Sequence, residues 1–421
     1  MLKGSALYIV IIISLVIALI CSTLVLAAYF FKGQYLVKSR FDRLQNNLSS
    51  GVHILLRTGG PTYLQGKTLN LFNNGDDSVR LKNIPWGIFD IGVVEAFKQQ
   101  DTLIKVFSTA FAIDSSKWAA IYLIDEDRSV SVSGKTTIRG NVYLPKAGVK
   151  AAYVDNKAYE GDKRLVIGNI HDSQRKLPLL NDIRLNGLEQ QFNNPGGIVN
   201  KNWHVDTLAG SFRRPVNIVN LGNSPYTIKN TKLSGNIIVY ADTLLTIDST
   251  AILNNVLVFA KAIVVKSGFH GSCQLFASDS ISIEKNCRLE YPSCLGLLRY
   301  KSPTIGFPPQ IIIGQNAQVS GIIFTYEKEA SALPTTISLG KGAQVIGQIY
   351  AQHILSTKDN AAVKGSVFTT RFMYQTAFSR YENYLINLKI DAPALSAYYL
   401  TSDLIPVASS EKKILQWLEV K

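Results

Sequence analysis

A run of uncharged, mostly apolar residues near the N-terminus constrains this chain more than any other feature. It extends over 27 residues from Ser5 to Phe31 and reads SALYIVIIISLVIALICSTLVLAAYFF. At a rise of about 1.5 Å per residue, a helix of this length reaches roughly 40 Å, enough to cross a hydrocarbon core of about 30 Å. The sequence therefore predicts a single transmembrane helix over residues 5–31.

A secretory signal peptide is the alternative interpretation of the same run. Lys3 would supply its basic start, and Leu26-Ala27-Ala28 resembles a cleavage site. The apolar part of a signal peptide spans about 7–15 residues, however, and this run is far longer. We therefore favour an anchor that the mature protein retains. A lipoprotein signal does not fit, because the residues before Cys21 are not the small ones that its cleavage requires.

The charges that flank the run bear on which side of the membrane the body lies. Four basic residues follow the run within twelve positions, whereas Lys3 and the amino terminus precede it. Basic residues are retained preferentially on the cytoplasmic side of a membrane. Counted alone, these charges favour a cytoplasmic body. The four residues are Lys32, Lys38, Arg40 and Arg43.

The residues before the run, Met1-Leu2-Lys3-Gly4, form a short basic leader that ends in glycine and is followed by Ser5. This N-terminus resembles the leader of type IV prepilins and type II secretion pseudopilins, in which a peptidase cuts after the glycine. The resemblance implies cleavage between Gly4 and Ser5 and a body exported from the bacterial inner membrane, against the charge count. The family's usual glutamate at the fifth mature position is replaced by Ile9, a departure shared with the large minor pseudopilins.

Apolar residues continue at helical spacing beyond the predicted membrane span. They recur at steps of three and four, with charged and polar residues between them, which predicts an amphipathic juxtamembrane helix over residues 32–58. Ser49-Ser50-Gly51 is expected to weaken the last turns of this helix, and Gly59-Gly60-Pro61 to end it. The apolar positions are Phe41, Leu44, Leu48, Val52 and Leu55.

A short phrase recurs in the remainder of the chain: a small residue, apolar residues, an aromatic and then alanine, threonine or leucine. The aromatics Tyr240, Phe259 and Phe276 are 19 and 17 residues apart, and Tyr350 and Phe368 are 18 apart. A second phrase, rich in isoleucine and valine, alternates with the first. The first phrase occurs at 140–144, 235–241, 255–260, 272–277, 321–325, 347–351 and 365–369, and the second at 244–247, 262–265, 281–283, 311–313 and 337–339.

Short β-branched strands at intervals of 17–19 residues, with Gly, Asn or Ser between them, are typical of a parallel β-helix. We therefore predict a mainly β fold: a single-stranded parallel β-helix over residues 129–370, with an insertion around 145–215. The segment Val130–Leu144 is interpreted as its first turn. A right-handed coil is favoured, with the handedness left open, and a β-sandwich of alternating strands is the alternative.

The recurring phrases also resemble a known family. Gly-x-Val or Gly-x-Ile phrases that alternate with Ile-x-Ile phrases, at about 18 residues per turn over residues 230–370, resemble bactofilins. Bactofilins are polymer-forming proteins of the bacterial cytoskeleton. The resemblance implies a structural body rather than an enzyme.

Motifs that carry chemistry are missing from the sequence, although two classes of enzyme are built on β-helices. Ile313-Gly314 and Leu339-Gly340 fit the units of hexapeptide acyltransferases, but neither His270 nor His353 lies beside consecutive hexads. The acidic residues of 235–370 do not recur at one position, as paired carboxylates or a calcium site would require. We predict no catalytic residue, cofactor or metal site. The histidines lack metal-ligand spacing; they are His53, His171, His204, His270 and His353.

Two cysteines occupy equivalent places in their phrases, Cys273 in Ser-Cys-Gln-Leu and Cys294 in Ser-Cys-Leu-Gly. On adjacent turns of a β-helix, level residues lie about 4.8 Å apart. This spacing permits a disulfide if the body is exported, and equally a ladder of two buried thiols. We prefer the ladder slightly, because Cys287 would leave an odd number of cysteines in the body.

The segments on either side of the predicted β-helix, and the net charge of the chain, allow further predictions about the fold and the partners. Residues 59–128 are interpreted as a small α+β region with an apolar helical stretch over Val93–Phe97 and Leu103–Phe111, and residues 371–421 as a C-terminal cap. The net charge of +14 is dispersed, which suits anionic lipid, polysaccharide or acidic partners and gives no indication of nucleic acid.

We therefore expect a single-pass, membrane-anchored structural or assembly protein, of the large minor pilin or pseudopilin kind, whose partners are membrane lipid and other pilin-like subunits. The alternative is a membrane-anchored β-helix that binds or acts on glycans.

Overall fold

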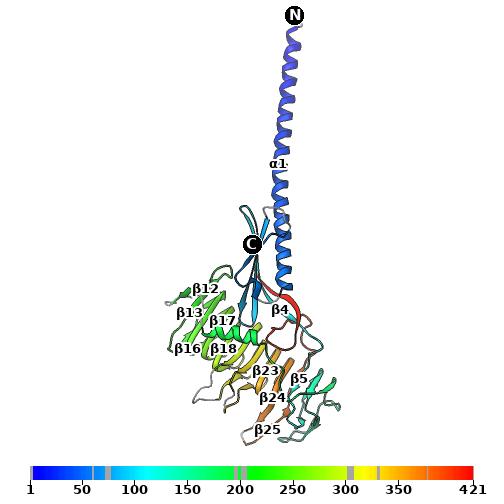
Figure 1. Ribbon diagram of the computed structural model, residues 1–421, viewed down its shortest axis with the longest axis vertical. Helices are drawn as coiled ribbons and strands as arrows, with labels where there is room; N and C mark the ends of the chain where they lie inside the picture. The colour runs from blue at the N-terminus through cyan, green and yellow to red at the C-terminus, as the bar shows by residue number, and fades with distance from the viewer. Residues whose placement is uncertain are drawn as a thin grey trace. The chain divides into compact units, whose positions relative to one another are not determined.

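The computed structural model describes residues 3–58, 61–71, 77–193, 198–200, 206–300, 308–329, 332–376 and 378–420. The fold is mainly β with one long N-terminal helix, as the sequence predicts (Figure 1). The helical elements are α1 (Lys3–Arg57), the 3-10 turn η1 (Pro61–Tyr63) and α2 (Asp182–Asn193).

The strands of the first half of the chain are β1 (Lys67–Leu69), β2 (Asp77–Trp86), β3 (Phe89–Lys98), β4 (Asp101–Ile113), β5 (Ile121–Leu123), β6 (Val130–Ser133), β7 (Thr137–Arg139), β8 (Val142–Leu144), β9 (Val149–Ala151), β10 (Ile170–Asp172), β11 (Ile198–Asn200), β12 (Thr207–Gly210), β13 (Asn217–Asn220), β14 (Tyr226–Ile228) and β15 (Lys232–Gly235). Those of the second half are β16 (Ile237–Ile247), β17 (Ile252–Val265), β18 (His270–Ile283), β19 (Arg288–Arg299), β20 (Gln310–Ile313), β21 (Gln318–Glu327), β22 (Thr336–Leu339), β23 (Gln344–Thr357), β24 (Ala362–Gln375), β25 (Arg380–Glu382), β26 (Tyr384–Ile386), β27 (Lys389–Asp391) and β28 (Ala408–Val420).

The chain forms two compact units. The anchor unit contains residues 1–83, 92–105 and 419–421, and the body unit contains residues 84–91 and 106–418. A five-stranded sheet in the order β1-β2-β3-β4-β28 contributes residues to both units. The other strands belong to the body unit, in a closed barrel and a three-stranded sheet in the order β26-β6-β9.

The anchor unit is organised around α1, a single helix that runs through both the predicted membrane span and its predicted continuation. Gly51 lies where the helix meets the strands: a Cβ atom there would come within 2.7 Å of Val94 and 2.9 Å of Leu81. The helix continues through Ser49-Ser50-Gly51 as far as Arg57, and the missing side chain of Gly51 lets it approach these strands closely. Gly59 and Gly60, predicted to end the helix, lie outside the described residues. The buried residues of α1 include Leu44, Leu48, Val52 and Leu55.

The helical stretch predicted over Val93–Phe97 and Leu103–Phe111 is also wrong. Both segments are strands, β3 and β4, joined by the two residues between Lys98 and Asp101. Their apolar residues are nearly continuous, and a short apolar run has no period that distinguishes a buried strand from a buried helix. Pairing with neighbouring strands decides the conformation here.

The body unit is built from strands that pair in parallel with strands one phrase further along the chain. Strands β16, β17 and β18 are neighbours, and β19, β21, β23 and β24 continue the series (Figure 1). The closed barrel also includes short strands from the predicted insertion, such as β10, which pairs with β8. Within the described part of this barrel, β25 departs from the parallel pattern and runs antiparallel to β24.

Level residues on successive strands form rows along the barrel. One interior row is fully buried and consists of Leu245, Ile263, Ile281, Ile311, Ile337, Leu355 and Phe372. Glycines form another row where the backbones approach: a Cβ on Gly347 would lie 2.0 Å from the Gly321 oxygen, and one on Gly365 would lie 1.8 Å from the Gly347 oxygen. Both have φ of +144°, which a side chain would oppose.

The segment Val130–Leu144 lies at a different place in the series from the one predicted. We expected it to precede the strands that begin near residue 235. Instead, β7 pairs with β27, and β5, which pairs with β8, also pairs with β24, so this segment stacks beyond the C-terminal strands. The place where this segment stacks on the C-terminal strands is here called the junction. Residues 371–421, predicted as a cap, contribute β27 to the junction and β28 to the five-stranded sheet. Periodicity reveals which strands are alike but not the order in which they stack.

Candidate functional sites: the helical anchor and the outer face of the body

The first part of α1 presents apolar side chains to the outside. Within the described residues, those from Ala6 to Val37 are exposed, including Ile9 at the position of the missing glutamate. By length and composition, α1 can cross a membrane. Gly4 and Ser5, the predicted cleavage residues, lie in the first turns of this helix, while Met1 and Leu2 lie outside the described residues.

A row of aromatic rings follows the outer face of the body unit. Tyr240, Phe259 and Phe276 are level on β16, β17 and β18, and their rings stack with centroid separations of 5.3 and 5.1 Å. Gly296 occupies the next level position, and the ring of Phe276 reaches past it to Phe324, with centroids 6.4 Å apart. The row thus contains the aromatics of the predicted phrase.

The row continues across the junction that the sequence did not predict. Phe368 stacks on Tyr122 at 5.8 Å, Tyr122 on Tyr143 at 5.4 Å, and Tyr143 on His171 at 5.0 Å. Since offset-stacked rings contribute about 0.5–1.5 kcal/mol per pair beyond the area that they bury, the row stabilises this junction. His171, which has no metal-ligand spacing in the sequence, ends the row as a stacking ring.

Residues 174–193, here termed the cover segment, lie over these aromatic rings. Tyrosine hydroxyls donate to its backbone: Tyr350 to Pro178 O at 3.0 Å, Tyr300 to Leu185 O at 3.0 Å and Tyr240 to Gln191 O at 2.5 Å. Phe192 packs edge-on against Phe259 at 5.5 Å. The cover segment, which falls within the predicted insertion, therefore buries the outer face of the strands.

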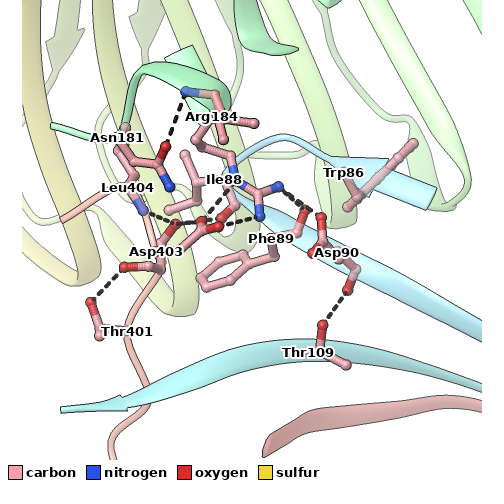
Figure 2. A network of polar contacts seen from close by, with 12 residues as sticks. Trp86, Ile88, Phe89, Asp90, Thr109, Asn181, Arg184, Thr401, Asp403 and Leu404 are labelled. Carbon is pink, nitrogen blue, oxygen red and sulfur yellow. Dashed lines mark hydrogen bonds and ion pairs between the residues drawn. The ribbon is translucent and has the colours of Figure 1, made fainter. Parts of the chain in front are cut away.

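Arg184 fastens the cover segment through a buried ionic network (Figure 2). Its guanidinium donates to Asp403 through Nε at 2.8 Å and Nη2 at 3.0 Å, and to Asp90 through Nη1 at 2.8 Å. Lys412 Nζ donates to the second oxygen of Asp90 at 3.0 Å. The side chains of Arg184, Asp90 and Lys412 are about nine-tenths buried. Two cations and two carboxylates thus neutralise one another.

The electrostatics of Asp90 follow from this arrangement. Burial opposes its ionisation, but the charges and hydrogen bonds of Arg184 and Lys412 outweigh burial and lower the pKa of Asp90 to about 2. For Arg184, burial disfavours the charged form, yet the carboxylates of Asp90 and Asp403 outweigh it and raise its pKa. Every charged group is paired, so the network is arranged to hold elements together rather than to transfer protons.

This network was not predicted from the sequence. Part of its signal is local: Asn181 precedes α2, and its side-chain oxygen accepts from Ile183 N at 3.0 Å, an N-cap that places Arg184 in the first turn. The partners of Arg184 are 94 and 219 residues away along the chain. No spacing rule relates residues at such separations.

The two cysteines of interest are buried free thiols. Cys294 is level with Gln274 rather than with Cys273, so the register differs by one residue from the predicted ladder. Alternate residues of a strand point to opposite faces, and Cys273 belongs to the interior core while Cys294 does not. Burial raises the pKa of Cys273 to about 12 and that of Cys294 well above its usual value.

Groups of three or more metal-ligating side chains are not found among the described residues. His353 contacts Thr335 Oγ1 at 2.9 Å through Nδ1, and the same nitrogen is 3.9 Å from the buried carboxylate of Glu327. Glu327 in turn pairs with Arg299 at 2.9 Å. His204 lies outside the described residues.

Comparisons with known proteins identify no family. Neither a protein-family model nor a curated protein matches the chain. Among solved structures, the chain is similar to that described as "Crystal structure of competence-associated pilin ComZ from Thermus thermophilus", with 11% sequence identity, a TM-score of 0.25, and coverage of 87% of this chain and 90% of that one. A similarity this low carries no functional argument, so the resemblances to pilins and bactofilins rest on the residues quoted above.

Proposed function

We propose that the chain is a membrane-anchored, non-catalytic assembly subunit of the pilin or pseudopilin kind. The observation that carries this proposal is the construction of α1. One unbroken helix of 55 residues is exposed and apolar in its first part, whereas its last turns pack into the anchor unit. The exposed part suits lipid or the helices of other subunits, and the packed part ties that helix to a folded domain.

The N-terminal residues support the same role. Lys3-Gly4-Ser5 has the order of a prepilin leader and cleavage site, and Ile9 agrees with a large minor subunit. In this proposal the peptidase cuts between Gly4 and Ser5, and the body lies outside the bacterial inner membrane. The basic residues that follow the span, such as Lys32 and Lys38, oppose this orientation.

We further propose that the parallel strands of the body form a single-stranded β-helix. Support comes from the register: β23 pairs with β24 eighteen residues further on, and the interior row of apolar residues passes from strand to strand without a gap. A coil of this kind gives a stiff body whose successive turns bury one another's apolar faces.

Mass spectrometry of the mature N-terminus tests the assembly role. We expect the protein purified from its native membrane to begin at Ser5, and to begin at Met1 when the prepilin peptidase is absent. Gly4→Leu should block the cut, whereas Gly33→Leu, placed on an open part of the same helix, should not. An intact Met1 in the presence of the peptidase, or a cut near Ala28, would contradict the proposal.

A reporter fused after Lys421 tests the orientation. An enzyme that is active only outside the cytoplasm should be active in this fusion, and one that is active only in the cytoplasm should not. The reverse pattern would place the body in the cytoplasm and remove the pilin-like role, while leaving the membrane anchor itself in place.

Engineered cysteines test the β-helix. Gln318 and Gln344 are level on neighbouring strands, about 4.8 Å apart, so cysteines at both positions should oxidise to a disulfide. Cysteines at Gln318 and Ala362, two strands apart, should not. Equal cross-linking of both pairs would show that the strands do not keep this order.

A further inference from the structure

Two open grooves flank residues 393–400 on the surface of the body unit. The first has a volume of about 490 Å³, and its lining includes Arg288, Glu290 and Gln318. The second has a volume of about 560 Å³ and shares Leu395, Ser396 and Tyr399 with the first. Tyr398 lines both grooves.

The ring of Tyr398 is almost fully open to solvent, with 92% of its surface exposed. The backbone that carries it is nevertheless well anchored. The buried Tyr399 donates its hydroxyl to Gly321 O at 3.2 Å, and Tyr291 donates to Leu400 O at 2.9 Å. Ser396 Oγ accepts from the N–H of Tyr398 at 3.2 Å. An aromatic face is therefore presented on a pre-organised segment, which lowers the ordering cost of binding.

Planar polar side chains form a row beside this ring. Arg288 and Gln318, which line the first groove, are level on β19 and β21, and Gln344 follows on β23 beyond the lining of the groove. The backbones of successive residues in this row lie about 4.8 Å apart. Glu290 adds a carboxylate whose oxygen is 2.8 Å from Nε2 of His270. Guanidinium, carboxylate and amide groups together offer donors and acceptors at regular intervals.

We propose that the first groove binds an extended glycan, with one sugar ring against Tyr398 and its hydroxyl groups bonded to the row that begins at Arg288. A sugar has an apolar face of C–H groups and a rim of hydroxyls that donate and accept, which matches a ring beside planar polar groups. The regular row suits a polymer of repeating units. A peptide is a poorer match, because peptides recognised by sheets add to a free strand edge, and this surface is the face of paired strands.

This proposal gives a location to the glycan-binding alternative predicted from the sequence, and it does not depend on the pilin-like role. The probes are soluble linear oligosaccharides of six sugar units, one neutral glucan, one N-acetylhexosamine polymer and one uronate polymer. Titration calorimetry uses the full-length protein in lipid nanodiscs, since detergents with sugar head groups would compete for the groove.

We expect at least one of the three oligosaccharides to bind. Tyr398→Ala should weaken that binding at least tenfold, and Gln318→Ala at least threefold, whereas Tyr398→Phe keeps the ring and should stay within threefold of the wild type. Tyr153→Ala is the matched control, because Tyr153 is also exposed, at 71%, but lines neither groove.

Three results would overturn the proposal: no binding of any of the three oligosaccharides, equal binding by wild type and Tyr398→Ala, or equal losses in Tyr398→Ala and Tyr153→Ala. Thermal unfolding of each variant establishes that the body is folded before titration. Because Tyr398 is exposed and on a segment anchored by Tyr399, its replacement is expected to leave the unfolding temperature unchanged.

Discussion

Replacing Arg184 with methionine tests whether the buried ionic network holds the cover segment to the body. Methionine keeps much of the volume of the arginine side chain and removes its positive charge. Removing one partner of a buried pair costs about 3–5 kcal/mol, since the remaining charge is left without compensation. Asp90 retains Lys412 at 3.0 Å, and the side chain of Asp403 is 25% exposed, so both carboxylates keep some stabilisation. We therefore expect the low end of this range, about 3 kcal/mol.

The assay is thermal unfolding followed by circular dichroism, at neutral pH and then at decreasing pH. For a unit of this size, a loss of about 3 kcal/mol lowers the unfolding temperature by roughly 5 °C. Arg164→Met is the matched control: Arg164 also pairs with an aspartate, Asp162, at 2.8 Å, but its side chain is 67% exposed. The control should unfold at the wild-type temperature, because exposed ion pairs contribute little.

The pH dependence of the Arg184→Met effect follows from Asp90. Its pKa is lowered from 3.8 to about 2 in the folded protein. A carboxyl group with a depressed pKa contributes stability above its unfolded pKa and loses it as the pH falls through the folded value, roughly 2 kcal/mol here. The difference in stability between the wild type and Arg184→Met should therefore have its full size above pH 4 and become smaller toward pH 2. This reasoning would be refuted if the difference in unfolding temperature between the wild type and Arg184→Met stayed constant down to pH 2. It would also be refuted if Arg184→Met lowered the unfolding temperature no more than Arg164→Met does.

Three further predictions concern packing and thiol chemistry. Gly51→Leu should destabilise the anchor unit by about 1–3 kcal/mol through overpacking, which proteolysis would detect as faster cleavage at the end of α1. Gly33→Leu is the control and should be cleaved at the wild-type rate. Equal cleavage rates for the two variants would contradict the close approach at Gly51. Tyr350→Phe should lower stability by about 1 kcal/mol through the lost bond to the cover segment, measured by urea unfolding, and a neutral effect would count against that bond. Cys273 and Cys294 should resist maleimide at pH 8 until urea unfolds the body, because burial raises their pKa values; rapid labelling of the native protein would disprove their burial.

Local patterns in the sequence predict those features of the fold that depend on near neighbours. The uncharged run before Phe31 and the apolar spacing that follows it predict α1, because helical contacts join residues three and four apart. The recurring aromatics predict which residues are level, as for Tyr240 and Phe259, since equivalent positions in similar strands meet across the sheet.

Other features were decided only by the tertiary structure. Val93–Phe97 is a strand because neighbouring strands pair with it, although its residues alone also suit a helix. The segment around Tyr143 stacks beyond Phe368 rather than before Tyr240, and Cys294 is one residue out of register with Cys273.

The cover segment and the ionic network of Arg184 were likewise decided only by the tertiary structure. Their hydrogen bonds join residues that lie from 49 positions apart, as for Tyr240 and Gln191, to 322 positions apart, as for Asp90 and Lys412. A contact between distant residues depends on how every intervening element packs, and a single sequence carries no period or spacing that reports it. The sequence by itself thus determined the anchor and the repeating strands. The order of stacking, the register and the buried ionic network arose only when the chain folded back on itself, because their free energy comes from contacts that no local pattern contains.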